Sequence, residues 1–390
     1  YSFFQNKSDN EIEDYIKSLY FLCRKVERDF NPSIIFTPNF VSLPHIIFYL
    51  YFKKKGIKVL ALSDSKVGNQ QIFVTDFFDE SGYFHEYLDK LESGEKSIEN
   101  KKKIEDFINK YHSNKISYLT TLDLRTFKTE IKNLAKMILS IIRSITHKDL
   151  NHIKNLGYTM DSQKPYVILR NYLSNIKNKI SEKFIKYDVF KKDEEFAFMP
   201  IQVQPESSID VQSVNFSNQI ETARKIAMHL PGDMKLYVKD HPFMYGLRNY
   251  SYLKKLQNTP NVKLIDFRVD SKEIINKCSL IICATGTTIF QSALIKKPCI
   301  MLGKTGTLKR LPNVFVQNSF VDLTKKINEL KYKEFDSISY TKKLYNYIEA
   351  SFQTGFDSGY INIWEKNLIS DLDIICNKII QELERNLYQK

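Results

Sequence analysis

The sequence predicts an α/β protein with parallel sheets and a helical insertion in its first half. Three observations support this class: apolar runs alternate with helical patterns in the second half, a strand–helix–strand pattern lies near the start, and helical periodicity fills the middle. A chain of 390 residues exceeds what one hydrophobic core usually serves. We therefore expect two domains.

The first predicted unit is a parallel strand–helix–strand motif. Ser33–Phe36 is a short β-rich run, His45–Lys54 has a helical pattern, and Lys58–Leu62 is apolar enough for a buried strand. A polar loop, Ser63–Gln70, follows the second strand. This spacing is typical of a parallel βαβ unit.

The region from about Phe84 to Lys191 is mainly helical and heavily charged, and it shows no clear strand. Ile98–Tyr111 and Phe127–Ile145 have the clearest helical patterns. The charged run Lys191–Glu195 then suggests a linker, although a solvated loop has the same composition.

The second half alternates strands with helices, as a doubly wound parallel sheet does. The predicted strands are Phe196–Val203, Lys235–Lys239, Val262–Ile265, Leu280–Ala284, Cys299–Leu302 and Val314–Val316. The predicted helices are Ser217–Leu230, Tyr250–Gln257, Ser271–Lys277, Thr288–Ile295 and Val321–Leu330. Ligands of such sheets bind beyond the carboxyl ends of the strands.

The last segment, Ile361–Tyr388, is predicted to be a long helix. Its apolar stripe consists of Leu368, Leu372, Ile375 and Ile379, which needs a covering neighbour. The predicted division is therefore an N-terminal lobe with the helical segment over residues 1–192, a C-terminal lobe over 193–360, and a helix over 361–390 that returns toward the N-terminal lobe.

The charge of the chain favours an anionic partner. Lys and Arg outnumber Asp and Glu by 58 to 45, a net charge of +13. Nucleic acid, an anionic membrane or a phosphorylated substrate all fit this excess, and so does an ordinary Lys-rich surface. The basic residues are dispersed and no nucleic-acid-binding module is recognisable, so nucleic acid is not expected.

Cysteine usage and hydropathy point to the cytoplasm. Five scattered cysteines without zinc-like spacing indicate reduced, mostly buried thiols. Prolines at 38 and 44 interrupt the most apolar stretch, Ile34–Phe52, which is therefore a strand and helix rather than a membrane anchor. No secretory signal pattern opens the sequence.

Three strand ends carry candidate functional residues, and the first is the tetrapeptide Lys239-Asp240-His241-Pro242. The proline holds the preceding backbone extended, which can direct the imidazole toward a ligand. Histidine donates hydrogen bonds to phosphate oxygens or leaving groups, and lysine adds a point charge. A lone histidine is nevertheless more often an ordinary turn or core residue.

The second strand end is Ala284-Thr285-Gly286-Thr287-Thr288, between a predicted strand and a helix. Glycine permits close backbone approach, and threonine hydroxyls and the free N–H groups of a first helical turn suit an anion. The loop lacks the lysine of a P-loop and the glycines of a dinucleotide fold. The alternative is a simple capped turn.

The third strand end is Gln202–Asp210, which contains Glu206 and Asp210. A carboxylate beside a cleft acts as a base, a nucleophile or a stabiliser of an oxocarbenium ion. The spacing does not assign these roles, and helix capping or solvent exposure explains both residues equally well.

In this order the motifs resemble the capsule polysaccharide biosynthesis family. The resemblance runs from Phe196 to Gly303 and includes Pro-Glu-Ser-Ser-Ile-Asp-Val-Gln, Leu-Tyr-Val-Lys-Asp-His-Pro, Asn-Val-Lys-Leu-Ile-Asp, Thr-Gly-Thr-Thr and Lys-Lys-Pro-Cys-Ile-Met-Leu-Gly. The family includes transferases for the acidic sugar Kdo. Its motif layout is similar to that of bacterial sialyltransferases, which have a His-Pro pair followed by a Ser/Thr loop.

The resemblance implies a GT-B-like fold with two Rossmann-like lobes and a CMP-activated sugar donor. It implies that His241 and Thr285, Gly286, Thr287 and Thr288 contact the donor phosphate, with Lys239 nearby. Asp210 would be the carboxylate at the reacting carbon, and Glu206 the second candidate. Many relatives have Glu in the helix after the Thr-Gly-Thr loop, where this chain has Gln291, an amide that can bind a ribose but cannot act as a base.

We therefore expect a glycosyltransferase that moves a Kdo-like or sialic-acid-like sugar to a surface-polysaccharide or lipid-linked acceptor, with peripheral contact to an anionic membrane at its inner face. No Asp-x-Asp motif stands out at a strand end, and the GT-B enzymes that the chain resembles typically need no divalent metal, so neither a metal nor a cofactor is expected. The alternatives are a transferase for CDP-glycerol, a UDP-sugar donor, and a catalytically silent nucleotide- or glycan-binding partner in capsule assembly.

Overall fold

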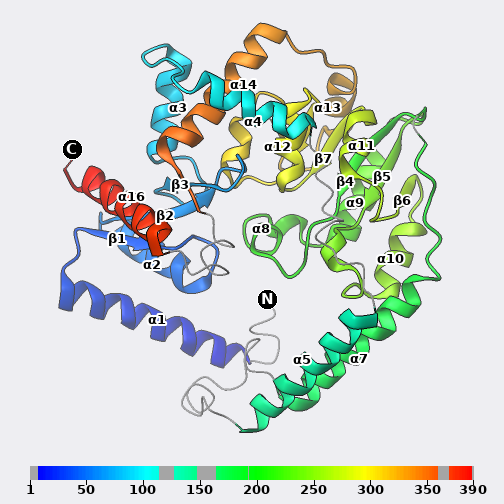
Figure 1. Ribbon diagram of the computed structural model, residues 1–390, viewed down its shortest axis with the longest axis horizontal. Coiled ribbons are helices and arrows are strands. Elements are labelled where there is room, and N and C mark those ends of the chain that lie inside the picture. Colours follow the sequence, from blue (N-terminus) through cyan, green and yellow to red (C-terminus); the bar gives the residue numbers. More distant parts are fainter. Residues whose placement is uncertain (1–7, 114–126, 147–163, 192, 359–368, 389–390) are drawn as a thin grey trace. The chain divides into compact units, whose positions relative to one another are not determined.

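The computed structural model describes two compact units. It covers residues 8–113, 127–146, 164–191, 193–358 and 369–388 (Figure 1). The first unit contains the described residues of 115–206 and 218–279. The second unit contains those of 8–114, 207–217 and 280–390.

The first unit is built on three parallel strands: β4 (Phe196–Pro200), β5 (Lys235–Lys239) and β6 (Val262–Ile265). β5 lies in the middle, with Phe196 opposite Lys235 and Leu236 opposite Val262. Residues 236–239 of β5 are all buried, as expected for a parallel strand covered on both faces.

Five helices belong to the same unit. They are α5 (Phe127–Thr146), α7 (Pro165–Glu182), α9 (Gln219–His229), α10 (Tyr250–Gln257) and α11 (Ser271–Lys277). α9 contacts β5 and β6, α10 contacts β6, and α5 and α7 run side by side (Figure 1). After α7, Asp188 pairs with the edge of β6 by donating its N–H to the Leu264 carbonyl at 2.8 Å. The helical segment is thereby joined to the sheet.

The charged run before β4 is part of this packing. Glu194 accepts hydrogen bonds from Lys263 Nζ at 2.7 Å and from the Tyr237 hydroxyl. The Tyr237 ring in turn stacks on Phe196, with ring centroids 4.1 Å apart. Glu194 is therefore a partly buried ion-pair partner rather than a solvated linker residue.

The second unit contains a four-stranded sheet in the order β1-β2-β3-β10. Its strands are β1 (Ile34–Thr37), β2 (Lys58–Asp64), β3 (Gln70–Val74) and β10 (Phe356–Asp357). β1 and β2 are parallel, and α2 (Leu43–Lys54) connects them, which confirms the predicted βαβ unit. β3 and β10 pair antiparallel and were not predicted.

Several helices pack in this part of the second unit. They are α1 (Asp9–Phe30), α3 (Tyr83–Ser93), α4 (Lys101–Ser113), α14 (Ser337–Thr354) and α16 (Ile369–Tyr388). α14 contacts both α3 and α4, and α1 contacts α2 (Figure 1).

The C-terminal helix α16 finds the neighbour that its apolar stripe requires. Ile375, Ile379 and Leu383 pack against a core cluster that includes Leu60 and Phe73. Leu372 is 44% exposed, so the stripe is shifted toward Leu383. Residue 368 lies outside the described residues.

The second unit also contains three parallel strands in the order β7-β8-β9: β7 (Leu280–Cys283), β8 (Cys299–Met301) and β9 (Val314–Val316). The short elements around them are α8 (Ser207–Asp210), η2 (Val214–Phe216), α12 (Thr287–Leu294), η4 (Thr307–Arg310) and α13 (Leu323–Leu330). The α/β class predicted from the sequence is confirmed.

The cysteines and the apolar character of the described helices agree with the expectations from the sequence. Cys23, Cys278, Cys283 and Cys299 are buried thiols, Cys376 is exposed, and none forms a disulfide, as predicted. Within the described ranges, no helix combines the length and apolar character needed to cross a bilayer.

Candidate functional site

His241 follows β5 in the first unit and caps the short helix η3 (Pro242–Met244). Its backbone is extended, as Pro242 requires. Nδ1 accepts a hydrogen bond from the Phe243 N–H at 3.2 Å, so the proton of the neutral ring lies on Nε2. Burial, followed by the positive charges of Lys239 and Arg248, lowers the pKa of His241 to about 4. At neutral pH the ring is thus an uncharged N–H donor.

A buried ion pair fixes the backbone next to His241. Asp240 and Arg248 are both buried, and Arg248 Nε donates to the two carboxylate oxygens at 3.1 and 3.0 Å. Burial raises the pKa of Asp240, while Arg248 acts in the opposite direction. The same carboxylate accepts the His241 N–H at 2.8 Å, and Arg248 also donates to the carbonyl of Gln202. The ends of β5 and β4 are therefore held together.

Lys239 lies inside the first unit. Its side chain is 5% exposed, and Nζ donates to Ser271 Oγ, at the start of α11, over 2.6 Å. Burial lowers the pKa of Lys239 to about 8, although Asp270, Asp266 and Asp240 oppose the shift. The ammonium therefore has a protein partner, and its role near a donor phosphate stays a prediction.

The end of β4 is fixed by glutamines, of which the sequence interpretation missed Gln219. The Gln202 N–H donates to Gln219 Oε1 at 2.6 Å, and Gln219 Nε2 returns bonds to the Gln202 carbonyl and to Gln204 Oε1. Gln219 is 2% exposed at the first position of α9. In the sequence, the only available signal for Gln219 was its position directly after Asn218, a residue type that often caps helices.

In the second unit the threonine-glycine loop leads into α12. The helix begins at Thr287, with Gly286 as its N-cap at φ 114°, a conformation that L side chains rarely adopt. No side chain caps the helix. Thr285 is buried, Thr287 exposed, and Thr288 and Gln291 half-buried. The first turn of α12 therefore offers backbone N–H groups and a hydroxyl to an anion.

Gly303, after β8, joins this loop to the segment that contains Asp210. The Gly303 N–H donates to the Ala284 carbonyl at 3.1 Å. A Cβ at position 303 would lie 2.4 Å from that oxygen and 2.6 Å from Ser213 Oγ, so only glycine fits. Thr305 Oγ1 also donates to the Gln212 carbonyl at 3.1 Å. The structure thus brings the loop after β7, the loop after β8 and residues 212–213 together.

The two candidate carboxylates belong to different units. Asp210 is half-buried at the end of α8 in the second unit, three residues before Ser213. Glu206 is exposed and is the last residue of its segment in the first unit. Asp210 is therefore the carboxylate whose own segment contacts Gly303, the neighbour of the threonine-glycine loop.

A pocket in the first unit was missed by sequence reasoning. It has a volume of about 310 Å³. It is lined by Lys179, Glu182, Lys183, Tyr187, Tyr245, Phe267 and Arg268. The rings of Tyr245 and Phe267 lie 5.1 Å apart at 34°. Glu182 is 8% exposed and accepts the Tyr187 hydroxyl at 2.8 Å, and burial raises its pKa. Aromatic faces beside a buried carboxyl suit a planar polar ligand.

Among the side chains that the structure describes, no group of three or more His, Cys, Asp or Glu is placed to hold a metal ion.

A sequence profile described as "Capsule polysaccharide biosynthesis protein" matches residues 95–306, more than half of the chain. The chain belongs to this family. This match confirms the resemblance that the motifs indicated. It also covers residues 95–191 of the helical segment, which the motifs did not include. A search of curated proteins finds no match.

Solved structures similar to this capsule-family chain include two transferase structures of KpsC from Thermosulfurimonas dismutans. The β-Kdo 2,7 transferase has 10% identity and a TM-score of 0.39, covering 89% of this chain and 88% of its own. The β-Kdo 2,4 transferase has 11% identity and a TM-score of 0.36, with coverages of 82% and 78%. UDP-GlcNAc 2-epimerase from Methanocaldococcus jannaschii has 14% identity and a TM-score of 0.30, with coverages of 82% and 76%.

Proposed function

We propose that this chain is a glycosyltransferase of GT-B type that moves an acidic sugar, Kdo or a sialic-acid-like sugar, from a CMP-activated donor to a capsule or lipid-linked glycan. Membership of the capsule polysaccharide biosynthesis family supports a role in making capsule polysaccharide. The observation that carries the chemistry is His241, held as a neutral Nε2–H donor at the end of β5 by the Phe243 N–H.

In the proposed reaction the bond between the anomeric carbon and the CMP phosphate breaks while an acceptor hydroxyl bonds to that carbon. The departing phosphate gains negative charge. His241 Nε2–H is proposed to stabilise this charge, as a donor whose ring is held by the Phe243 N–H. In the other unit, the N–H groups of the first turn of α12 and the Thr287 hydroxyl are proposed as a second donor set for the same phosphate. Lys239 contributes a positive charge from within the sheet.

Asp210 is proposed as the carboxylate at the reacting carbon, and Glu206 is the second candidate. If configuration inverts, Asp210 removes the proton of the acceptor hydroxyl as that oxygen replaces CMP. If configuration is retained, Asp210 first attacks the anomeric carbon as CMP leaves, and the acceptor hydroxyl then displaces the carboxylate and releases its proton to solvent. Its segment's contact with Gly303 supports the choice. Gln291, half-buried in α12, is proposed to hydrogen-bond the ribose.

The cytosine ring is proposed to occupy the pocket that Tyr245, Phe267 and Glu182 help to line, and to stack on one aromatic face. Its volume, about 310 Å³, is at the small end for ligand sites and suits one planar ring. Aromatic side chains stack on nucleobases, a contact worth about 1–3 kcal/mol. The Glu182 carboxyl, whose pKa is raised by burial, is proposed to hydrogen-bond the ring.

A donor assay tests the function directly. Turnover of CMP-Kdo or CMP-sialate with release of CMP supports the proposal. Turnover of CDP-glycerol would instead identify a polyol-phosphate transferase, and turnover of a UDP-sugar would reassign the donor. Nucleotide binding without transfer to any glycan acceptor would favour a silent partner in capsule assembly, a reading that the neutral Gln291 makes worth testing.

The proposed reaction needs neither a metal ion nor a cofactor, because protein donors stabilise the leaving group. We expect full turnover in excess chelator. Complete loss of turnover that one divalent ion restores would contradict this part of the proposal.

A further inference from the structure

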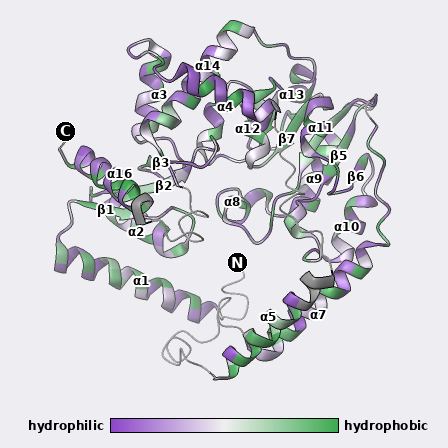
Figure 2. Ribbon diagram, viewed as in Figure 1, coloured by the Kyte–Doolittle hydropathy of each residue, from purple (hydrophilic) through white to green (hydrophobic). Residues whose placement is uncertain are grey.

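Helix α5 presents an exposed apolar stripe. Leu134, Ile138, Ile142 and Ile145 are 41%, 46%, 48% and 62% exposed. Their spacing of four, four and three residues places them on one side of the helix. Met137 and Ile141 are less exposed and lie along one flank of this stripe. The exposed surface of α5 therefore carries an apolar stripe from Leu134 to Ile145, and the ribbon of this helix includes hydrophobic stretches in Figure 2.

Its neighbour α7 carries a second exposed stripe. Tyr166, Leu169, Leu173, Ile180 and Phe184, the last just beyond the helix end, are between 42% and 70% exposed. They recur at helical spacing and follow one side of α7. Large apolar side chains scattered singly on a surface are ordinary, whereas two continuous stripes on adjacent helices indicate an interaction surface.

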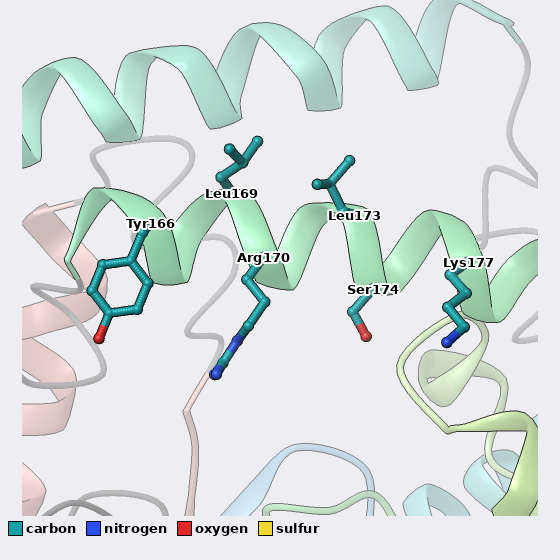
Figure 3. A pocket seen from close by; sticks show the side chains of 6 residues that line it. All are labelled: Tyr166, Leu169, Arg170, Leu173, Ser174 and Lys177. Atoms are coloured by element: carbon teal, nitrogen blue, oxygen red, sulfur yellow. The ribbon is translucent and has the colours of Figure 1, made fainter.

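An open groove follows α7 (Figure 3). Its volume is about 590 Å³, and its described lining is Tyr166, Leu169, Arg170, Leu173, Ser174 and Lys177. Leu169 and Leu173 extend toward the side where α5 runs, whereas Arg170, Ser174 and Lys177 point the opposite way (Figure 3). The cations Arg170 and Lys177 therefore line the same groove as the apolar side chains of α7, but on its other side.

The opposite side of α7 is fixed to the first unit. Asn175 and Asn178 both donate their amide groups to the Gly246 carbonyl, at 3.0 and 3.3 Å. Gly246 lies five residues after His241, and Asn178 is 7% exposed. The exposed apolar stripe of α7 therefore lies away from this anchored side, and part of it faces the side where α5 runs.

The two helices are strongly basic. Together they carry seven Lys and Arg against two Glu, a net charge of +5. The basic residues are Lys128, Lys132, Lys136, Arg143, Arg170, Lys177 and Lys179, and the acidic residues are Glu130 and Glu182. Lys179 and Glu182 both line the pocket of the first unit, so the rest of the two helices still carries six cations against Glu130.

We propose that α5 and α7, the basic hairpin, dock this protein on a membrane surface that carries anionic lipids. A bilayer interface takes both features at once, since apolar side chains enter the acyl boundary while Lys and Arg contact anionic headgroups. A second copy of the chain would bring the same positive charge against the hairpin and repel it. The cations interrupt both helices too often for either to span the bilayer.

This surface goes beyond the proposed function, because it requires no particular donor. Docking through the hairpin would hold the loop of His241 at a fixed position relative to the membrane, through the hydrogen bonds to Gly246. A lipid-linked acceptor would then meet an enzyme that is already oriented at the interface.

Vesicle flotation with the full chain tests the inference. Vesicles of phosphatidylglycerol mixed with phosphatidylcholine should bind the protein, and added salt should weaken binding. The double variant Ile138→Asn/Leu173→Asn should bind about tenfold or more weakly, because two inserting side chains become polar. Met228→Asn, which replaces a 77% exposed apolar residue on α9, should bind as the natural chain does.

Each part of the inference has an outcome that overturns it. Equal flotation of the natural chain and the double variant, or no flotation of the natural chain, contradicts the docking surface. Equal binding to pure phosphatidylcholine contradicts the requirement for anionic lipid. Dissociation of a stable dimer by the double variant, seen in sedimentation, would show a second copy as the occupant. Unchanged thermal unfolding of the double variant establishes that the exposed substitutions leave the fold intact, so its flotation result counts.

Discussion

The carboxylate of Asp240 accepts two hydrogen bonds from Arg248 Nε, at 3.1 and 3.0 Å, where both side chains are buried. Because burial makes an unpaired charge costly, Arg248→Met should lower the free energy of unfolding by about 3–5 kcal/mol. Chemical denaturation measures this change. Arg224→Met is the matched control, since the exposed Arg224–Glu221 pair should contribute at most about 1 kcal/mol. Equal losses in the two variants would refute the structural role.

His241→Ala should weaken CMP binding about tenfold or more, because a hydrogen bond to an anionic phosphate is lost. Isothermal titration calorimetry measures the affinity. His229→Ala, which changes a half-buried histidine at the C-terminal end of α9 in the same unit, should bind CMP normally. Natural affinity in His241→Ala would remove the imidazole from the mechanism.

Donor turnover should not decline as the pH rises from about 5.5 to about 7.5. The pKa of His241 is lowered to about 4, so the ring is already neutral throughout this range and remains an N–H donor. If the charged imidazolium were the active form, it would lose its proton between about pH 5.5 and about 7.5, and turnover would fall. A decline centred near pH 6.5 that His241→Asn removes would show that the charged form acts.

Gly303→Ala should destabilise the second unit by about 1–3 kcal/mol and reduce turnover, since the added Cβ would lie 2.4 Å from the Ala284 carbonyl oxygen. Thermal unfolding and a donor assay report the two effects. Gly232→Ala, where a Cβ meets nothing within 4 Å, serves as the control. Normal turnover in Gly303→Ala would show that the contact between Gly303 and Ala284 is not needed for function.

His85 should make stability fall in mild acid. It is 4% exposed, and burial lowers its pKa from 6.5 to about 4. Between these values the unfolded chain binds a proton that the folded chain excludes, so stability decreases as the pH drops from about 6.5 toward 4. The loss amounts to roughly 2 kcal/mol at about pH 5. Chemical denaturation at about pH 6.5 and about pH 5 measures the free energy of unfolding. His85→Gln should lose less of this free energy at the lower pH than the natural chain, and an identical loss would contradict the assignment to His85.

Asp210→Asn should abolish transfer while CMP affinity stays near normal, because the amide keeps the shape but loses the charge. Single-turnover assays and calorimetry separate the two. If Asp210→Asn stays active and Glu206→Gln does not, the carboxylate role moves to Glu206.

The sequence predicts the second half closely. Lys235–Lys239, Val262–Ile265 and Val314–Val316 are strands with the predicted bounds. The first two are largely buried strands in a parallel arrangement, so they read as apolar runs between turn residues. Such a pattern is local and needs no knowledge of partners.

Elements that depend on distant partners were missed. β3 begins with Gln70 and Gln71 and pairs with Phe356 and Asp357, which no local pattern indicates. The helix α14 was also overlooked, since buried polar residues interrupt its apolar stripe. One of them, Glu349, accepts the N–H groups of Glu99 and Asn100 from far along the chain.

The same limit applies to the site. Spacing singled out His241 and the Thr285–Thr288 loop as candidates, which stay predictions, and gave no side-chain direction for Lys239, which donates to Ser271. The pocket beside Glu182 was missed because it combines a helical segment of the first half with two loops of the second. Tertiary packing creates such sites, and periodicity does not encode them.

A thermal-shift comparison of CMP, CDP, UDP and GDP tests the donor assignment most directly, because a ligand that binds only the folded state raises the melting temperature. We predict that CMP gives the largest rise in the natural chain and that His241→Ala loses most of it. A larger rise with UDP or GDP, or an undiminished CMP response in His241→Ala, would contradict the account.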